Sequence, residues 1–239
     1  MSRKFYIPSQ NKLVVEPETT RTAVLELTES FRPKQVIIPK DIARRFVVDD
    51  IFIDQFRQGK NDSQMMSPGS LPAAVFAEDA IAETYDFDST RPCDKFCLSV
   101  TNITTEPSPF MFCLSGDREP LDPNLQSRHL PLGFGRWLVQ PRGRIHVYTQ
   151  PIKPFKGQRL VVPSQIADNF SISQIRVGKH DQLTTSAPAS LFTEQTPRVG
   201  AQGLGLDTVS PSLFLEIVAD NISQTVCHFT CAFLGTFVN

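Results

Sequence analysis

The four histidines are the first residues to consider for chemistry, because imidazole is a common ligand of metal ions. They are His129, His146, His180 and His228. No His-x-His pair occurs, and no histidine shares its position in the internal repeat described below with another. A barrel that holds a metal through paired histidines is therefore excluded. We predict no metal site and no cofactor.

The five cysteines do not form a recognisable pattern either. Cys93 and Cys97, like Cys227 and Cys231, are four residues apart, which on a strand is a separation of about 13 Å. The sequence contains no Cys-x-x-Cys and no Gly-x-Ser-x-Gly nucleophile motif. We expect small buried thiols, no catalytic residues and no enzymatic activity.

Carboxylate and amide side chains give two further candidate sites. Asp49, Asp50 and Asp54 could hold calcium, but the repeat places Ser173 and Gln174 opposite the first two, so a solvated strand face is the better interpretation. Asn102-Ile-Thr and Asn221-Ile-Ser occupy the same place in both copies of the repeat. We expect these two asparagines to serve turns.

One stretch of the chain has an uneven charge. No acidic residue occurs between Asp122 and Asp168, and seven bases give this window a charge of +7. The bases are Arg128, Arg136, Arg142, Arg144, Lys153, Lys156 and Arg159. Aromatic residues lie among them, a mixture that contacts phosphates and stacks on bases in single-stranded nucleic acid. The alternative is a basic surface that docks on the first half of the chain through Asp49, Asp50 and Asp54.

Composition limits the class of protein. The 239 residues include 24 Lys+Arg and 25 Asp+Glu, which excludes a uniformly basic coat or an acidic disordered chain. Nineteen prolines, 12 glycines and 18 phenylalanines favour short strands and many turns over a helical bundle. No apolar run reaches the roughly 18 residues of a membrane span, and no secretory leader is evident, so we expect synthesis in the cytoplasm as a soluble chain.

The chain contains an internal repeat. Phe31–Ile53 (FRPKQVIIPKDIARRFVVDDIFI) aligns without a gap on Phe155–Val177 (FKGQRLVVPSQIADNFSISQIRV). Further pieces align in the same order, among them Asp88–Thr104 over Asp207–Ser223, and the match ends with Phe110 and Gly116 over Phe229 and Gly235. Such collinearity predicts a duplication, with a first domain over 1–117, a linker over 118–134 and a second domain over 135–239. A weaker similarity pairs the opening strands, Lys4–Ile7 with Arg136–Val139.

Each copy has about eight strand candidates by alternation and residue type. In the first copy they are Phe5–Ile7, Thr22–Leu27, Val36–Ile38, Phe46–Asp54, Gln64–Met66, Thr84–Phe87, Phe96–Thr101 and Phe110–Leu114. One-turn helices should follow Pro39 and Pro163, and a second turn should follow Pro72 and Pro188. This pattern predicts an all-β protein of two tandem Greek-key or jelly-roll sandwiches.

The duplicated all-β pattern resembles the tandem (double) jelly-roll capsid proteins of viruses and phages, over the whole chain and without a sequence motif. The resemblance implies a structural subunit of a virion, made in the host cytoplasm, that forms a homo-oligomeric shell, with a trimeric capsomer as one form. Its partners would be further copies of itself, other virion proteins and, through the basic window, nucleic acid bound without sequence preference. This chain is shorter than expected for the class. The alternative is a cytoplasmic, bivalent, non-catalytic binding module, for example one of lectin type.

Overall fold

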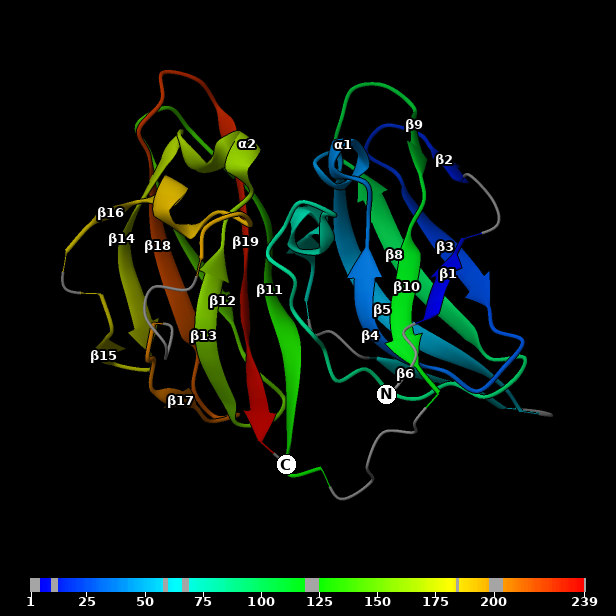
Figure 1. Ribbon diagram of the computed structural model, residues 1–239. Coiled ribbons are helices and arrows are strands. Elements are labelled where there is room, and N and C mark those ends of the chain that lie inside the picture. The colour runs from blue at the N-terminus through cyan, green and yellow to red at the C-terminus, as the bar shows by residue number, and fades with distance from the viewer. Residues whose placement is uncertain are drawn as a thin grey trace.

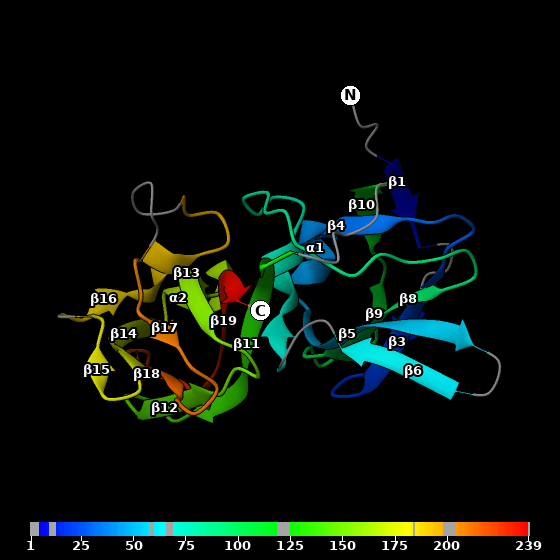
Figure 2. The same ribbon diagram turned by 90° about the horizontal axis from the view of Figure 1, so that it is seen from below.

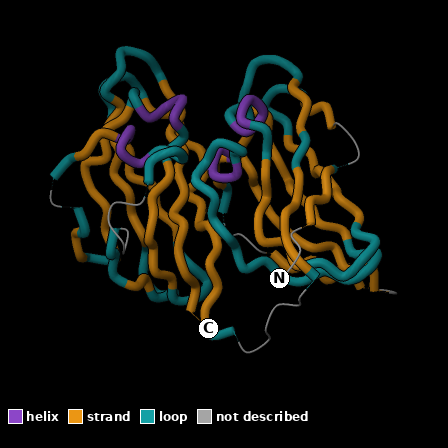
Figure 3. The backbone as a smooth tube through the Cα atoms, viewed as in Figure 1, coloured by secondary structure: helices purple, strands orange, loops and turns teal. Residues whose placement is uncertain are grey.

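The computed structural model describes residues 5–9, 13–57, 60–65, 69–118, 125–183, 185–197 and 204–238. They form two β-sandwiches that stand side by side, with their long strands in similar directions (Figure 1). The one-turn helices lie at the same end of both sandwiches (Figure 3). The predicted all-β fold with two tandem jelly rolls is confirmed.

The second sandwich shows the strand order in its simplest form. One sheet has the order β11-β19-β13-β17, and the other has β12-β18-β14-β15 with β16 beside β14. All of these pairs are antiparallel, and neighbours in a sheet are far apart in the sequence, which is the Greek-key arrangement of a jelly roll. The strands are β11 (Ser127–Val139), β12 (Arg144–Thr149), β13 (Phe155–Val161), β14 (Phe170–Val177), β15 (His180–Asp181), β16 (Ala187–Pro188), β17 (Thr208–Val209), β18 (Leu215–Asn221) and β19 (Cys227–Val238).

The first sandwich repeats this order. One sheet is β1-β10-β4, continued by the pair β2-β9, and the other is β3-β8-β5-β6 with β7 beside β5. In place of β17 it has a single bridge between Phe31 and Thr90. The strands are β1 (Phe5–Pro8), β2 (Leu13–Val15), β3 (Thr20–Glu26), β4 (Arg32–Ile37), β5 (Phe46–Arg57), β6 (Lys60–Met65), β7 (Leu71–Pro72), β8 (Lys95–Asn102), β9 (Ser108–Phe110) and β10 (Cys113–Asp117).

Irregularities of the ladders also recur. The register of β5 against β8 shifts between Val48 and Asp50, and that of β14 against β18 shifts between Ile172 and Gln174. These are equivalent positions of the sequence repeat. A bulge bends a strand and increases its twist, so the two sheets bend at the same place.

Short helices follow the prolines as expected. Helix α1 (Lys40–Ala43) begins directly after Pro39, and α2 (Ser164–Ala167) directly after Pro163. A 3-10 turn follows Pro72 and Pro188 in the same way, as η1 (Ala73–Phe76) and η2 (Ala189–Phe192). Proline has its φ angle fixed near the helical value and lacks the N–H that a helix start leaves unpaired, so it favours these starts.

Phenylalanine rings fill the space between the sheets of each sandwich. Phe46 packs on Phe110 and Phe170 packs on Phe229, with ring centroids 5.0 Å apart in both pairs. All four side chains are at most 1% exposed. Equivalent positions of the repeat therefore form the core in both halves.

Three details differ from the sequence-based expectation. Residues 84–87 form no strand, because the amide of Tyr85 donates to Lys34 O of β4 and that of Asp86 donates to His129 O of β11, so the segment pairs continuously with neither strand. Residues 127–134, expected in the linker, belong to β11 and thus to the second sandwich. The opening strands also align differently: Phe5 pairs with Gly116 and Leu130 with the equivalent Gly235, so β1 corresponds to the start of β11. The predicted match of residues 4–7 with 136–139 is wrong over the described residues 5–7, since the counterpart of 137–139 is β2.

Candidate assembly interface

Strand β11 meets the first sandwich through its backbone. The amide of Gly135 donates to the carbonyl oxygen of Ser70 at 2.9 Å. A Cβ atom placed on Gly133 would lie 2.2 Å from the same oxygen, so no side chain fits there without a shift of the backbone. A Cβ atom on Gly69, which has φ +79°, would lie 2.9 Å from the carbonyl oxygen of Gly133. The two sandwiches are therefore joined by a fixed, tightly packed contact.

The start of β11 is hydrogen-bonded to the loop around Asp86. The amide of Asp86 donates to His129 O at 2.9 Å, and the amide of His129 donates to Asp86 Oδ2 at 2.8 Å. Arg128 donates to the carbonyl of Asp86 through Nη2 at 2.6 Å and pairs with Asp88 at 2.9 Å. Asp86 is itself held by Arg32 at 2.8 Å. Asp86 is thus bound to the start of β11 through both its backbone and its side chain.

Charged and aromatic side chains are buried where the sandwiches meet. Arg159, which is 5% exposed, lies 3.3 Å from Glu83 and donates to the carbonyl of Glu194 at 2.7 Å. His129 lies 3.4 Å from the other oxygen of Glu83 and stacks on Tyr85. Burial raises the pKa of Tyr85, so its hydroxyl stays neutral. Removing one partner of such a buried pair would leave an uncompensated charge, which is strongly destabilising.

Glu194 forms a second buried contact. Its side chain is fully enclosed, accepts from the backbone and hydroxyl of Ser164 at 2.8 and 2.6 Å, and lies 3.8 Å from Arg44 of the first sandwich. Its carbonyl accepts from the amide of Ile81 at 3.0 Å. Arg44 in turn pairs with Asp79 at 3.2 Å. Loop 77–88 is thus attached to the second sandwich along its length.

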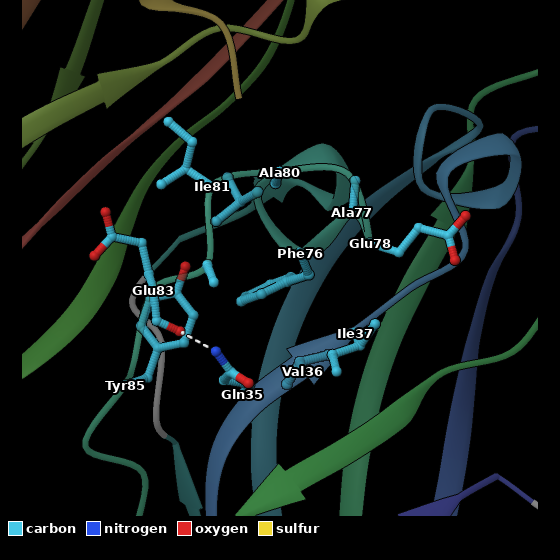
Figure 4. Close-up of a pocket in the computed structure, with 12 residues that line it drawn as sticks. Gln35, Val36, Ile37, Phe76, Ala77, Glu78, Ala80, Ile81, Glu83 and Tyr85 are labelled. Atoms are coloured by element: carbon cyan, nitrogen blue, oxygen red, sulfur yellow. Dashed lines mark hydrogen bonds between the residues drawn. The ribbon is translucent and has the colours of Figure 1, made fainter. Parts of the chain in front are cut away.

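A small cavity lies beneath this loop, between Phe76, Tyr85 and the end of β4 (Figure 4). Its volume is about 100 Å³, and Gln35 closes one side by donating to the carbonyl of Glu83 at 3.2 Å. Small-molecule sites usually have about 300–1,000 Å³. We interpret this space as a packing gap of the interface.

The seven predicted basic residues fall into different places. Arg128 and Arg159 bind the first sandwich as described, and Arg136 pairs with Glu18 at 2.9 Å. Docking of the basic window on the first half thus occurs, but through Glu18, Glu83, Asp86 and Asp88 and not through the predicted Asp49, Asp50 and Asp54. The acidic partners were missed because they are dispersed in the sequence and gather only on folding.

The other four basic residues are exposed on the second sandwich. Arg144 pairs with Asp220 at 2.6 Å, and this hydrogen bond lowers the pKa of Asp220. Arg142 donates to the side-chain oxygen of Gln224 at 2.7 Å in the amide orientation that satisfies both groups. Lys153 precedes β13 and Lys156 lies on it, remote in sequence from the β11–β12 turn. Nucleic-acid binding by these residues stays a prediction.

The surfaces that join the sandwiches are not equivalent to each other. The first sandwich contributes β7 and loop 77–88, whereas the second contributes β11. On the outer sides, β16 with the following η2 is the counterpart of β7 with η1, and β1 is the counterpart of the start of β11. Val75 of η1 is 5% exposed but its counterpart Leu191 is 53% exposed, and Pro131 of β11 is buried but its counterpart Tyr6 is 62% exposed. The outer counterparts of both positions therefore expose an apolar residue to solvent.

An exposed aromatic pair lies on the outer sheet of the second sandwich. Tyr148 and Phe214 are each 52% exposed, with ring centroids 6.4 Å apart. The register of the ladders places Val24 and Lys95 at their positions in the first sandwich. The pair is therefore not duplicated.

Within the residues that the structure describes, no group of three or more His, Cys, Asp or Glu side chains is placed to hold a metal. None of the described helices has the length and apolar character of a membrane span.

Comparison with known proteins gives similarity at the level of structure. No protein-family model and no curated protein sequence matches the chain. The STIV MCP is 9% identical with a TM-score of 0.45, over 99% of this chain and 97% of that one. A chain from the atomic structure of Sulfolobus Turreted Icosahedral Virus is 12% identical with a TM-score of 0.44, over 98% and 91%. The major capsid protein P2 from Bacteriophage PM2 is 7% identical with a TM-score of 0.41, over 99% and 98%.

Proposed function

We propose that this chain is a structural subunit of a virus or phage capsid, and that its building block is a ring of three chains. The observation that carries the proposal is the non-equivalence of the two surfaces that join the sandwiches. An interface of this kind leaves one unused copy of each surface at the two ends of the chain, and repetition gives either a closed ring or a filament.

A closed ring is compatible with the parallel arrangement of the sandwiches. Both stand with their helices at the same end (Figure 3), so repetition of the contact spreads units in a plane. Three chains provide six sandwiches, and six equal steps of about 60° close a ring. In this ring, η2 with Leu191 packs on the β1 edge with Tyr6 of the next chain, on the side where β7 meets β11 within one chain. The approach is less close than at Gly133, because Pro8 occupies the equivalent position of β1. The rings would tile a shell with other virion proteins, and the chain would reside in the virion.

The test is the mass of the purified full-length chain by multi-angle light scattering, with electron microscopy of the particles. We expect trimers or larger assemblies. Leu191→Glu should shift the mass toward the monomer, because it places a charge in the apolar contact. Ile152→Glu is the matched control, since Ile152 is 75% exposed in the β12–β13 loop. A monodisperse monomer at high concentration would refute the proposal, as would equal effects of both variants.

The alternative of a lectin-like binding module has one supporting observation, the exposed pair Tyr148 and Phe214. Aromatic rings of this kind bind the apolar face of sugars. Because the first sandwich has Val24 and Lys95 instead, such a site would be single and the module would not be bivalent. Binding to a glycan array by the wild type, lost in Tyr148→Ala, would favour this function.

A further inference from the structure

An open cleft of about 420 Å³ lies between the two sandwiches and is lined by neither Arg159 nor Glu83. Strands β5 and β8 border it on one side, and β11 and β19 on the other. Figure 2 shows β11 as the strand of the second sandwich nearest to β5. The volume is within the range of small-molecule sites, which often lie at domain boundaries.

The wall of the first sandwich presents a carboxylate in a fixed position. Asp49 accepts a hydrogen bond from Ser70 Oγ at 3.0 Å through Oδ1 and one from Thr101 Oγ1 at 2.6 Å through Oδ2. Both partners are neutral hydroxyls. Among the described residues no cationic side chain forms an ion pair with Asp49, so its charge is held in place and not neutralised.

The opposite wall carries no net positive charge to balance it. Arg136 pairs with Glu18 at 2.9 Å, and its second nitrogen lies 3.1 Å from Nδ1 of His228. Burial and the neighbouring Arg136 lower the pKa of His228, so this imidazole is neutral at pH 7. Because Arg136 is a donor, Nδ1 accepts and the proton is on Nε2. The charge of Arg136 is neutralised by Glu18, so the cleft keeps the negative charge of Asp49.

Apolar side chains complete the cleft. Ile103 lies on the side of the first sandwich, and Leu138, 55% exposed, lies on the side of the second. Such walls pack against methylene groups. We propose that the cleft binds a small aliphatic amine, whose ammonium group donates to Asp49 and whose carbon chain lies between Ile103 and Leu138. This site is independent of the capsid function proposed above.

Isothermal titration calorimetry of the full-length chain with 1,4-diaminobutane at low ionic strength tests the site. We expect a Kd of about 1 mM or below, as for a small ligand with one charged contact. Asp49→Asn keeps the acceptor for one hydroxyl but removes the charge, and should weaken binding about tenfold or more. Leu138→Ser should weaken it about threefold or more through the loss of apolar contact. Asp168→Asn and Ile222→Ser are the controls, because both residues are exposed outside the cleft, and each should change the Kd less than about twofold.

The pH dependence separates this proposal from an anion site at Arg136. Glu18, Asp49, Arg136 and His228 are the titratable and charged groups here, and acidification protonates His228 and adds a positive charge. Binding of the diamine should weaken as the pH falls from 7 to 5, whereas binding of an anion would strengthen. No heat of binding for the diamine, equal effects of Asp49→Asn and Asp168→Asn, or preferential binding of succinate would each overturn the proposal. If the protein is a monomer and still binds the diamine, the proposed ring is refuted but the proposed amine site is supported.

Discussion

Asn102 and Asn221 make the same hydrogen bonds at equivalent corners of the two sandwiches. Each amide nitrogen donates across the sandwich, to Val15 O at 2.8 Å and to Val139 O at 3.2 Å, and also to the carbonyl four residues ahead, at 2.8 and 2.9 Å. Each Oδ1 accepts from the amide two residues ahead at 2.9 Å. The expected turn role is confirmed, and the same side chain also ties the turn to the facing sheet.

Replacement of either asparagine by alanine should destabilise the fold. Asn102→Ala and Asn221→Ala each remove these bonds and leave buried backbone carbonyls without a donor, so we expect a loss of about 2–4 kcal/mol in the free energy of unfolding. Urea denaturation followed by circular dichroism measures it. Gln224→Ala, an exposed change in the same loop as Asn221, should cost less than about 0.5 kcal/mol. A large cost at one asparagine and none at the other would contradict their equivalence.

The two phenylalanine pairs should be equally important. Phe46→Ala and Phe170→Ala each leave a cavity beside a packed ring, and we expect each to cost about 3–5 kcal/mol. Phe214→Ala is the control, because Phe214 is 52% exposed and should lose less than about 1 kcal/mol. Chemical denaturation of the three variants decides the matter. A cost under about 1 kcal/mol at Phe46 or Phe170 would show that these rings do not support the core.

Gly133→Ala should loosen the contact between the sandwiches. Its Cβ would lie 2.2 Å from Ser70 O, so one backbone must move, at a cost of about 1–3 kcal/mol. We expect a larger radius of gyration by small-angle X-ray scattering and faster limited proteolysis. Gly205→Asn is the control: Gly205 has φ +60° and open space around it, and asparagine tolerates this conformation. An unchanged radius and digestion rate for Gly133→Ala would mean that the contact adapts.

Binding of nucleic acid should depend on the basic side chains that lie outside the interface between the sandwiches. We expect the chain to bind single-stranded DNA without sequence preference and with steep salt dependence, and the triple variant Arg142→Gln, Lys153→Gln, Lys156→Gln to lower the slope by about 2 log units per log unit of salt. Fluorescence anisotropy at several salt concentrations measures this slope. Lys40, Arg45 and Arg91 are exposed on the first sandwich, and their replacement by Gln is the control. Absence of binding at low salt, or an equal effect of the control, would contradict nucleic-acid binding by the basic window. Its role would then be to dock the second sandwich on the first.

The sequence alone was sufficient for features set by local pattern. Alternating apolar residues and the repeated phenylalanines predict the strands and core positions of both halves, because a strand buries every second side chain whatever its partner. Prolines 39, 72, 163 and 188 predict the short helical turns, because the restricted φ of proline acts on its own segment. The same local reasoning assigned a turn to Asn102 and Asn221.

Tertiary structure decided which segments contact each other. Residues 84–87 have the composition of a strand, but form a loop whose backbone bonds to β4 at Tyr85 and to β11 at Asp86. Arg159 and Glu83 are 76 residues apart and form a pair only when the sandwiches meet. The Gly133 contact and the cleft at Asp49 likewise depend on the relative position of the sandwiches. Pairing between distant residues is determined by the summed packing of the whole chain, because no local preference encodes a partner so remote in the sequence.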